Sequence, residues 1–221
     1  MVIRNVCKPN HHSFFVMRQL RLIILWLAAM LCEVAGAAQP RGWADSLRSG
    51  DLLFVGDSTG MGQAVQESTG RYSHVAIVER RGEGLYVIDA TPANGVARRP
   101  LGQLLEEGMP VDVYRLTVPF DTAAMLGRAQ ELIGQPYDNA FLPDNGALYC
   151  SELICTVYLS RQGKPLFSTK PMNWRDADGN MPDYWVEHFR KLGMPVPEGV
   201  EGTNPADLAR SSVLKYVFPL Q

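Results

Sequence analysis

The thiol of Cys150 is the side chain in this sequence that is best placed to act as a nucleophile. It follows a loop and opens the apolar segment 150–154 (CSELI), which is expected to begin a buried helix. Unpaired N–H groups at a helix N-terminus create a positive potential that favours a thiolate and can hold a developing oxyanion. Because a free cysteine is most often buried and inert, helix position alone leaves a nucleophile and a core residue both open.

Cys155 lies five residues further along the same expected helix and has no such advantage. Its position inside the helix predicts a core residue. Side chains five apart on a helix point in different directions, so Cys150 and Cys155 are badly placed to form a disulfide with one another.

A nucleophilic thiol needs a base, and His74 is the better of two candidates. It lies in the apolar strand segment 73–77 (SHVAI), where a lone histidine is more often structural than catalytic. The alternative, His188, lies in 187–191 (EHFRK), which is typical of a solvated helix face. An activated thiolate requires an imidazole partner, which favours His74.

Asp89 is the expected partner of His74. It lies near the end of the strand segment 87–90 (VIDA), which forms an antiparallel hairpin with the strand that carries His74. A carboxylate buried among apolar residues is costly unless it is paired, and a cross-strand imidazole would pair it. Asp89 would then orient and stabilise His74 as the third member of a triad.

Ser58 is a competing nucleophile, because 56–60 (GDSTG) fits GxSxG and carries the Gly-Asp-Ser triplet of SGNH esterases. In an α/β-hydrolase several strands precede the nucleophile, whereas one does here. Neither His74 nor His188 has an aspartate three residues before it, as an SGNH enzyme would need. Since motifs of five residues arise by chance, a Gly-rich turn is the favoured interpretation.

The elements that must position these side chains predict an α+β domain, with an antiparallel sheet packed on helices. The strands are expected at 51–55, 72–79, 85–90, 111–116 and 214–218. The helices are expected at 63–68, 101–107, 150–159, 183–192 and 206–209, with a further helix that Asp121 caps and Gly134 ends. Residues 135–148 are expected to be a loop.

The composition narrows the class of protein. With 46% apolar and 20% charged residues, the 221-residue chain is expected to be globular. Its formal net charge of -2 and the absence of a basic stripe argue against a nucleic-acid partner. Four cysteines without a CxxC pair or zinc-ligand spacing predict neither a disulfide scaffold nor a metal site, and no cofactor is expected.

Residues 1–37 are predicted to be a signal peptide. Arg18 and Arg21 precede the apolar run 22–31, and the small residues 35–38 (AGAA) offer a cleavage site. The run has ten residues, short of the roughly 20 that a membrane-spanning helix needs. Export to the periplasm or the medium is therefore expected.

Two further features of this leader bear on export. The stretch before Met17 is long and polar for a signal peptide, so Met17 is a candidate true start. Cys32 raises the alternative of a lipoprotein, but Leu31 precedes it where a small residue is normally needed. Cleavage leaves 38–221 as one domain with a net charge of -5 and two cysteines, 150 and 155, beside two histidines, 74 and 188.

Several segments, in order along the chain, resemble the YaeF/YiiX branch of the NlpC-type papain-like superfamily. They are 50–54 (GDLLF), 64–66 (AVQ), 69–70 (TG), 72–78 (YSHVAIV), 87–90 (VIDA), 134–138 (GQPYD), 149–153 (YCSEL) and 203–209 (TNPADLA). The pattern is also similar to that of lecithin retinol acyltransferase-like enzymes. This resemblance implies a circularly permuted papain-like fold, in which the histidine strand precedes the nucleophile helix.

Carried onto the matching positions, the resemblance implies Cys150 as nucleophile, His74 as base and Asp89 as the orienting residue. The usual residue at the third position of this branch is Glu, and Asp89 is one methylene shorter. Tyr137 matches a tyrosine that recurs before the nucleophile, where it would contribute to an oxyanion or substrate site or belong to the core.

The expected function is an exported cysteine amidase or peptidase that acts through a thioester on an amide or ester bond. Its expected partners are a small peptide, an acyl amide or a lipid, with peripheral association with a membrane or a cell wall as an option. The alternatives are a thiol acyltransferase or lipid hydrolase, a binding module of the same fold that turns nothing over, and a serine esterase that uses Ser58.

Overall fold

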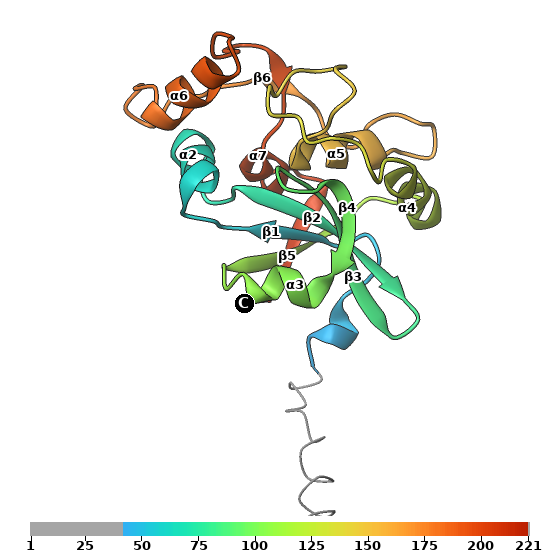
Figure 1. The fold of residues 1–221 in the computed structure, drawn as a ribbon. Coiled ribbons are helices and arrows are strands. Elements are labelled where there is room, and N and C mark those ends of the chain that lie inside the picture. The colour runs from blue at the N-terminus through green and yellow to red at the C-terminus, as the bar shows by residue number, and fades with distance from the viewer. Residues whose placement is uncertain (1–41, 221) are drawn as a thin grey trace, which may run out of the picture. The chain divides into compact units, whose positions relative to one another are not determined.

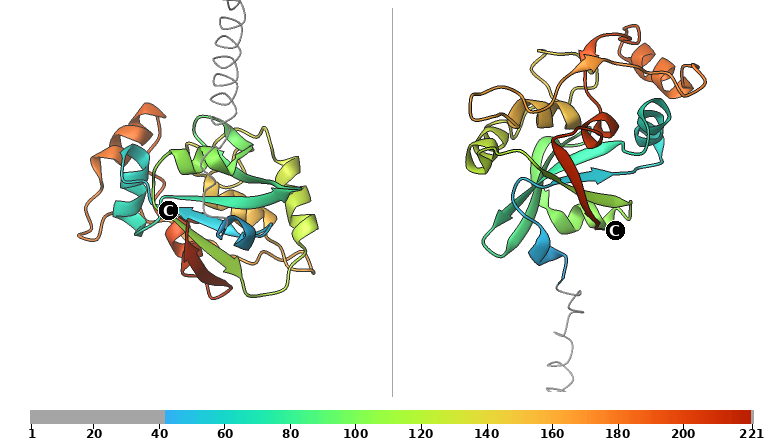
Figure 2. Two further views of the ribbon diagram at one scale, coloured as in Figure 1. Left: turned by 90° about the horizontal axis from the view of Figure 1, so that it is seen from below. Right: turned by 180° about the vertical axis from the view of Figure 1, so that it is seen from behind.

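A six-stranded antiparallel sheet organises residues 42–220, which are the residues that this computed structural model describes (Figure 1). Its strand order is β4-β3-β2-β1-β5-β8. The strands are β1 (Leu52–Val55), β2 (His74–Arg81), β3 (Gly84–Thr91), β4 (Gly95–Pro100), β5 (Val111–Leu116) and β8 (Leu214–Pro219). β8 runs beside β5 and so forms one edge of the sheet, as the rear view shows (Figure 2).

The helices and a second small sheet surround this central sheet. The helices are η1 (Ala44–Ser46), α2 (Gly60–Thr69), α3 (Leu101–Glu106), α4 (Thr122–Glu131), α5 (Cys150–Val157), α6 (Asp183–Lys191) and α7 (Pro205–Ala209). The two-stranded sheet pairs β6 (Lys170–Pro171) with β7 (Glu201–Gly202). The chain from Trp43 onward forms one compact unit.

Apolar side chains fill both faces of the central sheet. Leu52 and Phe54 of β1 pack under α4 and α5, whereas Leu53 and Val55 face the opposite side, where α3 packs. Figure 1 shows α5 above the sheet, α3 below it and α4 at its right-hand end. A strand that is buried on both faces reads as a continuous apolar run, which is why β1 shows no alternation.

A third apolar cluster lies beside the sheet, where α2 and α6 pack against each other. It is rich in aromatic rings, among them Phe141, Trp174, Trp185 and Phe189. The indole N–H of Trp185 donates to the carbonyl of Ala64 in α2 across 3.3 Å. This hydrogen bond satisfies the polar atom of an otherwise apolar ring and fixes the contact between the two helices.

The predicted α+β class with an antiparallel sheet is confirmed. The predicted cap of α4 is also present, because the Asp121 carboxylate accepts the Ala124 N–H across 2.9 Å. Several helix boundaries differ from prediction by one to three residues. α2 already begins at Gly60, and α5 ends at Val157 because Tyr158 leaves the helical conformation with a ψ of 90°.

Strand β4 was not predicted from the sequence. It is an edge strand that carries Arg98 and Arg99 and ends in Pro100, so its sequence lacks the apolar pattern by which the other strands of the sheet were predicted. Charged residues and proline are typical of edge strands, where they block further strand addition. Its first residue must be glycine, because a Cβ on Gly95 would collide with the carbonyl oxygen of Gln135.

The predicted signal peptide, the candidate start at Met17 and Cys32 all lie outside the described residues. Among residues 42–220, no helix combines the length and the apolar character needed to cross a membrane.

Candidate active site

Cys150 is the first residue of α5, as the sequence predicted. Tyr149 before it has an extended backbone, and the first hydrogen bond of the helix joins the Leu153 N–H to the Tyr149 carbonyl across 3.0 Å. The N–H groups of Cys150 and Ser151 precede that bond and have no acceptor within the helix. They are therefore available to an oxyanion that forms next to the thiol.

His74 and Asp89 are joined across the hairpin of β2 and β3. The register that pairs Ile77 with Ile88 places Asp89 opposite Ala76, two residues from His74, so both side chains share a face. His74 Nε2 lies 2.9 Å from Asp89 Oδ2. The carboxylate side chain is 1% exposed and the imidazole 18%, so the pair is shielded while the ring still reaches the surface.

The Cys150 side chain interacts with the same imidazole ring. Because Asp89 engages Nε2, the second ring nitrogen, Nδ1, is the one left for the thiol. Burial of the ring opposes its protonation, but the contacts with Asp89 and Cys150 outweigh burial and raise the pKa of His74 to about 10. The surroundings of the ring thus favour an imidazolium beside Cys150.

Arg99 is a further charged residue at this site, and the sequence did not point to it. Its Nη2 lies 2.7 Å from Asp89 Oδ2, the same oxygen that His74 contacts, and its other terminal nitrogen pairs with Glu107. Burial by itself would raise the pKa of Asp89, but the contacts with His74 and Arg99 outweigh it, so the pKa of Asp89 lies below its usual value. Arg99 was not identified from the sequence because β4 was not predicted. The signal that could have indicated this edge strand was the pair of arginines before Pro100.

A cavity of about 50 Å³ lies next to Cys150. Tyr137 lines it, so this tyrosine is close to the thiol, as the resemblance implied. The Tyr137 hydroxyl donates only to the sulfur of Met61, at 3.8 Å, which is a weak acceptor. Burial and the neighbouring Cys150 hold the pKa of Tyr137 well above its usual value, so the hydroxyl remains a donor.

Three other candidates lie elsewhere. Ser58 is exposed in the turn between β1 and α2 and does not line the cavity. His188 contacts the carbonyl oxygen of Asn139 across 2.7 Å through Nε2 and stacks on Tyr184. Cys155 packs at the margin of the core, where burial raises its pKa to about 11.

Residues 46–218 match the model of a family described as permuted papain-like amidase enzymes, YaeF/YiiX, C92 family. The chain belongs to this amidase family. Membership confirms the permuted papain-like fold that the sequence pattern implied, with a histidine strand ahead of a cysteine helix.

Relatives and a solved structure agree with this membership. The uncharacterised protein YiiX of Escherichia coli (strain K12) is 24% identical over 189 residues, which cover 80% of this chain and 84% of that protein. The crystal structure of YiiX from Escherichia coli O157:H7 is similar in fold, with a TM-score of 0.65 and 23% identity over 77% of this chain and 96% of that one.

A second curated relative matches over a shorter region. The S-adenosylmethionine:tRNA ribosyltransferase-isomerase of Prochlorococcus marinus (strain MIT 9313) is 31% identical over 123 residues, or 55% of this chain. The chain spans 31% of that protein's length.

The YiiX protein from E. coli O157:H7 is described as a metalloprotein. In the present chain, by contrast, residues 42–220 contain no group of three or more His, Cys, Asp or Glu side chains placed to hold a metal ion. At the candidate site the Asp89 carboxylate is already engaged by His74 and Arg99. The donor set around Cys150 therefore does not fit a metal ion.

The Ser151 hydroxyl is buried and has no hydrogen-bond partner among the described residues. A buried hydroxyl without a partner costs about 1–3 kcal/mol. We therefore expect Ser151→Ala to leave the free energy of unfolding unchanged or to raise it by about 1 kcal/mol, as measured by urea denaturation. Ser73→Ala is the matched control, because Ser73 Oγ accepts the Asp57 N–H across 2.9 Å and its loss should destabilise. A clear loss of stability in Ser151→Ala would contradict the prediction.

Proposed function

We propose that this chain is an exported cysteine amidase in which Cys150 is the nucleophile, His74 the general base and Asp89 the orienting residue. The observation that carries the proposal is the 2.9 Å contact between His74 and a buried carboxylate, in a ring that also interacts with a cysteine at a helix N-terminus. Nucleophile, base and orienting group in this order form the general arrangement for covalent acyl transfer. Membership in an amidase family supports the same chemistry.

In the proposed reaction the proton of the Cys150 thiol passes to His74, which gives a thiolate–imidazolium pair, and the thiolate attacks the carbonyl carbon of an amide. The oxyanion of the tetrahedral intermediate accepts hydrogen bonds from the backbone N–H of Cys150 and from the hydroxyl of Tyr137. The C–N bond then breaks, and the imidazolium gives its proton to the leaving amine. Water, deprotonated by His74, attacks the carbonyl carbon of the thioester. The C–S bond then breaks, and the imidazolium returns its proton to the Cys150 sulfur, which releases the acid and the free thiol.

Asp89 and Arg99 have different roles in this proposal. The Asp89 carboxylate holds the His74 ring with Nδ1 toward the thiol and stabilises the imidazolium that each step creates. Arg99 shares the carboxylate oxygen and keeps Asp89 ionised, so it acts as a positioning residue.

The proposed compartment is the periplasm or the medium, and the proposed substrates are amides of cell-wall peptides or of lipids. The compartment is supported by the basic and apolar pattern of residues 18–31 followed by 35–38 (AGAA). The substrate pool follows from that compartment, since both kinds of amide are accessible to an exported enzyme.

Alkylation by iodoacetamide tests the nucleophile directly. At pH 7, Cys150 should be labelled at least tenfold faster than Cys155, because a thiolate reacts and burial raises the pKa of Cys155 to about 11. The two rates are read separately by mass spectrometry of the peptides that contain each cysteine. Equal, slow labelling of both residues would overturn the thiolate proposal, and His74→Ala should slow the labelling of Cys150 alone.

A further inference from the structure

The cavity beside Cys150 is small for a ligand site. Its volume is about 50 Å³. One water-sized sphere occupies roughly 10–15 Å³, so the cavity has room for about three to five non-hydrogen atoms. Pockets that enclose drug-sized ligands have volumes of about 300–1,000 Å³. A long acyl chain therefore cannot be enclosed in it unless the walls move.

Aromatic rings hold one side of the cavity in place. The rings of Trp174 and Trp185 meet edge to face with their centroids 4.7 Å apart. Ser68 connects them, since its hydroxyl accepts the indole N–H of Trp185 across 3.2 Å and donates to the Trp174 carbonyl across 2.8 Å. These contacts join α2, α6 and the segment before α6, so this wall is fixed by three parts of the chain.

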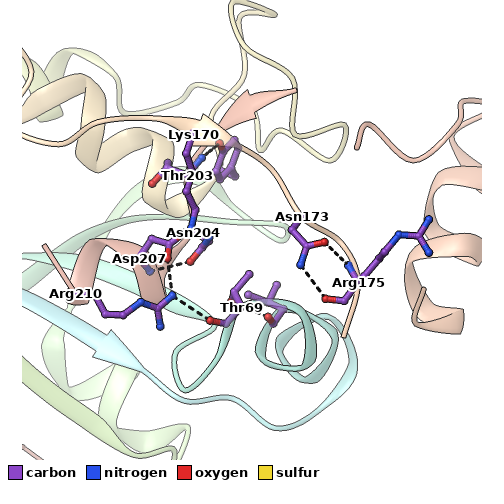
Figure 3. A network of polar contacts seen from close by, with 10 residues as sticks. Thr69, Lys170, Asn173, Arg175, Thr203, Asn204, Asp207 and Arg210 are labelled. Atoms are coloured by element: carbon purple, nitrogen blue, oxygen red, sulfur yellow. Dashed lines mark hydrogen bonds and ion pairs between the residues drawn. The ribbon is translucent and has the colours of Figure 1, made fainter. Parts of the chain in front are cut away.

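A charged network supports another part of the lining, which Thr203 and Asn204 form (Figure 3). The Asn204 amide donates to the Asp207 carboxylate across 2.6 Å, and the Asp207 N–H donates back to Asn204 across 2.8 Å. Lys170 and Arg210 pair with the same carboxylate, and Arg210 also donates to the carbonyl of Thr69 at the end of α2. Moving this wall would break several charge-assisted hydrogen bonds.

Met172 is the adjustable part of the lining. It packs on Gly202, where a Cβ would lie 2.7 Å from Met172 Cγ and 3.0 Å from the Tyr149 hydroxyl. An alanine at position 202 would force the flexible Met172 side chain, which lines the cavity, to shift. Truncation of Met172 itself would enlarge the cavity.

The lining also sets the charge of the occupant. Among the described residues, no acidic or basic side chain borders the cavity, and Met61, Phe141 and Trp185 are among the apolar side chains that do. A charged group would lose hydration there without gaining an oppositely charged partner. The occupant must therefore be uncharged.

The position of His74 indicates which part of a substrate enters. The imidazole must protonate the leaving amine, yet His74 is not among the residues that line the cavity, whereas Cys150 is. The leaving group then lies outside, and the substituent on the acyl side of the carbonyl lies inside.

We propose that this cavity is the acyl subsite and that it selects amides whose acyl side carries a short, uncharged aliphatic group of up to about four carbons, which the available volume sets. The proposal rests on the proposed amidase function. Either a simple short-chain acyl amide or a peptide with a residue such as alanine at this position would present that group, whereas a long-chain fatty amide would not.

Hydrolysis of two series of p-nitroanilides tests the subsite. Acetyl, butyryl, octanoyl and palmitoyl anilides vary chain length, and the N-acetylated anilides of alanine, leucine and glutamate vary the side chain. In the wild-type protein kcat/KM should be at least tenfold higher for butyryl than for octanoyl, and at least tenfold higher for alanine than for leucine or glutamate. A higher kcat/KM in the first series would identify simple acyl amides as the substrates that supply the short group. A higher kcat/KM in the second series would identify peptides.

Size variants and a binding measurement separate this proposal from the proposed function. Met172→Ala should raise the ratio of octanoyl to butyryl hydrolysis at least tenfold, and Gly202→Ala, which forces Met172 to shift, should change the ratio of butyryl to acetyl hydrolysis. In Cys150→Ala, ligand-observed NMR should show binding of butyramide in preference to octanamide. If butyramide binds but no anilide is hydrolysed, the proposed amidase function is contradicted and the proposed acyl subsite is retained. Hydrolysis that prefers octanoyl, or no binding of butyramide, would overturn the subsite.

Discussion

Replacement of Cys150 by alanine is expected to abolish amide hydrolysis, with kcat/KM falling on the order of 10⁴- to 10⁶-fold, as removal of a nucleophile from a triad does in other enzymes. The reason is that no other described thiol borders the cavity or the His74 ring. The measurement is hydrolysis of the best anilide of the panel at pH 7, with the fold checked by circular dichroism.

Cys155→Ala is the matched control, because Cys155 lies on the same helix but does not line the cavity. It should keep the activity of the wild-type protein within about threefold, since it removes only a small part of the packing. Hydrolysis that survives in Cys150→Ala, or that is lost equally in both variants, would contradict the assignment of the nucleophile.

The Cys150→Ala variant also separates two alternative functions. A binding module would hold amides equally well with and without the Cys150 thiol, and its wild-type form would hydrolyse neither series of anilides. A serine esterase that uses Ser58 would be labelled by a fluorophosphonate probe in Cys150→Ala. The exposure of Ser58 and its position outside the lining of the cavity argue against labelling.

Asp89→Asn is expected to lower kcat/KM on the order of 10³- to 10⁴-fold, because it removes the carboxylate that orients and charges His74. It should also shift the pH profile. The Asp89 contact raises the pKa of His74 toward about 10, so the variant should lose its imidazolium at a lower pH than the wild-type protein. The alkaline limb of kcat/KM against pH is therefore expected to move to lower pH.

Stability should follow the same linkage. The pKa of His74 is raised in the folded state. The interactions of the imidazolium therefore stabilise the fold fully below pH 6.5, and this stabilisation is lost as the pH rises through about 10. The pKa of Asp89 is lowered in the folded state, so the carboxylate stabilises the fold above pH 3.8, and this stabilisation is lost as the pH falls below that value. The difference between wild type and Asp89→Asn should thus be largest near pH 5, at about 3 kcal/mol, and should narrow toward pH 9 and pH 2.

Asp89→Glu provides the control for charge. It keeps a carboxylate at the position, so it should restore the alkaline limb toward that of the wild-type protein even if its longer side chain lowers kcat. A pH profile of Asp89→Asn that coincides with the wild-type profile, or an Asp89→Glu profile that matches Asp89→Asn, would show that the carboxylate does not set the charge of His74.

The sequence by itself determined the elements whose pattern is local. The hairpin of β2 and β3, the Asp121 cap of α4 and the start of α5 at Cys150 were all read from spacing within about ten residues. The placement of His74 near Asp89 also followed, because two adjacent antiparallel strands fix which side chains share a face. The scarcity of cysteine and histidine then limited the candidates for nucleophile and base.

Tertiary structure alone decided the features that join distant parts of the chain. Arg99 reaches Asp89 because β4 adds to the edge of the sheet, and its charge is compensated by carboxylates on other elements rather than by any local pattern. The cavity is formed by residues from Met61 to Pro205, whose packing depends on side-chain shape and cannot be read from periodicity. Chain pattern thus indicated the groups that are proposed to react, and packing decided the size and lining of the cavity beside them.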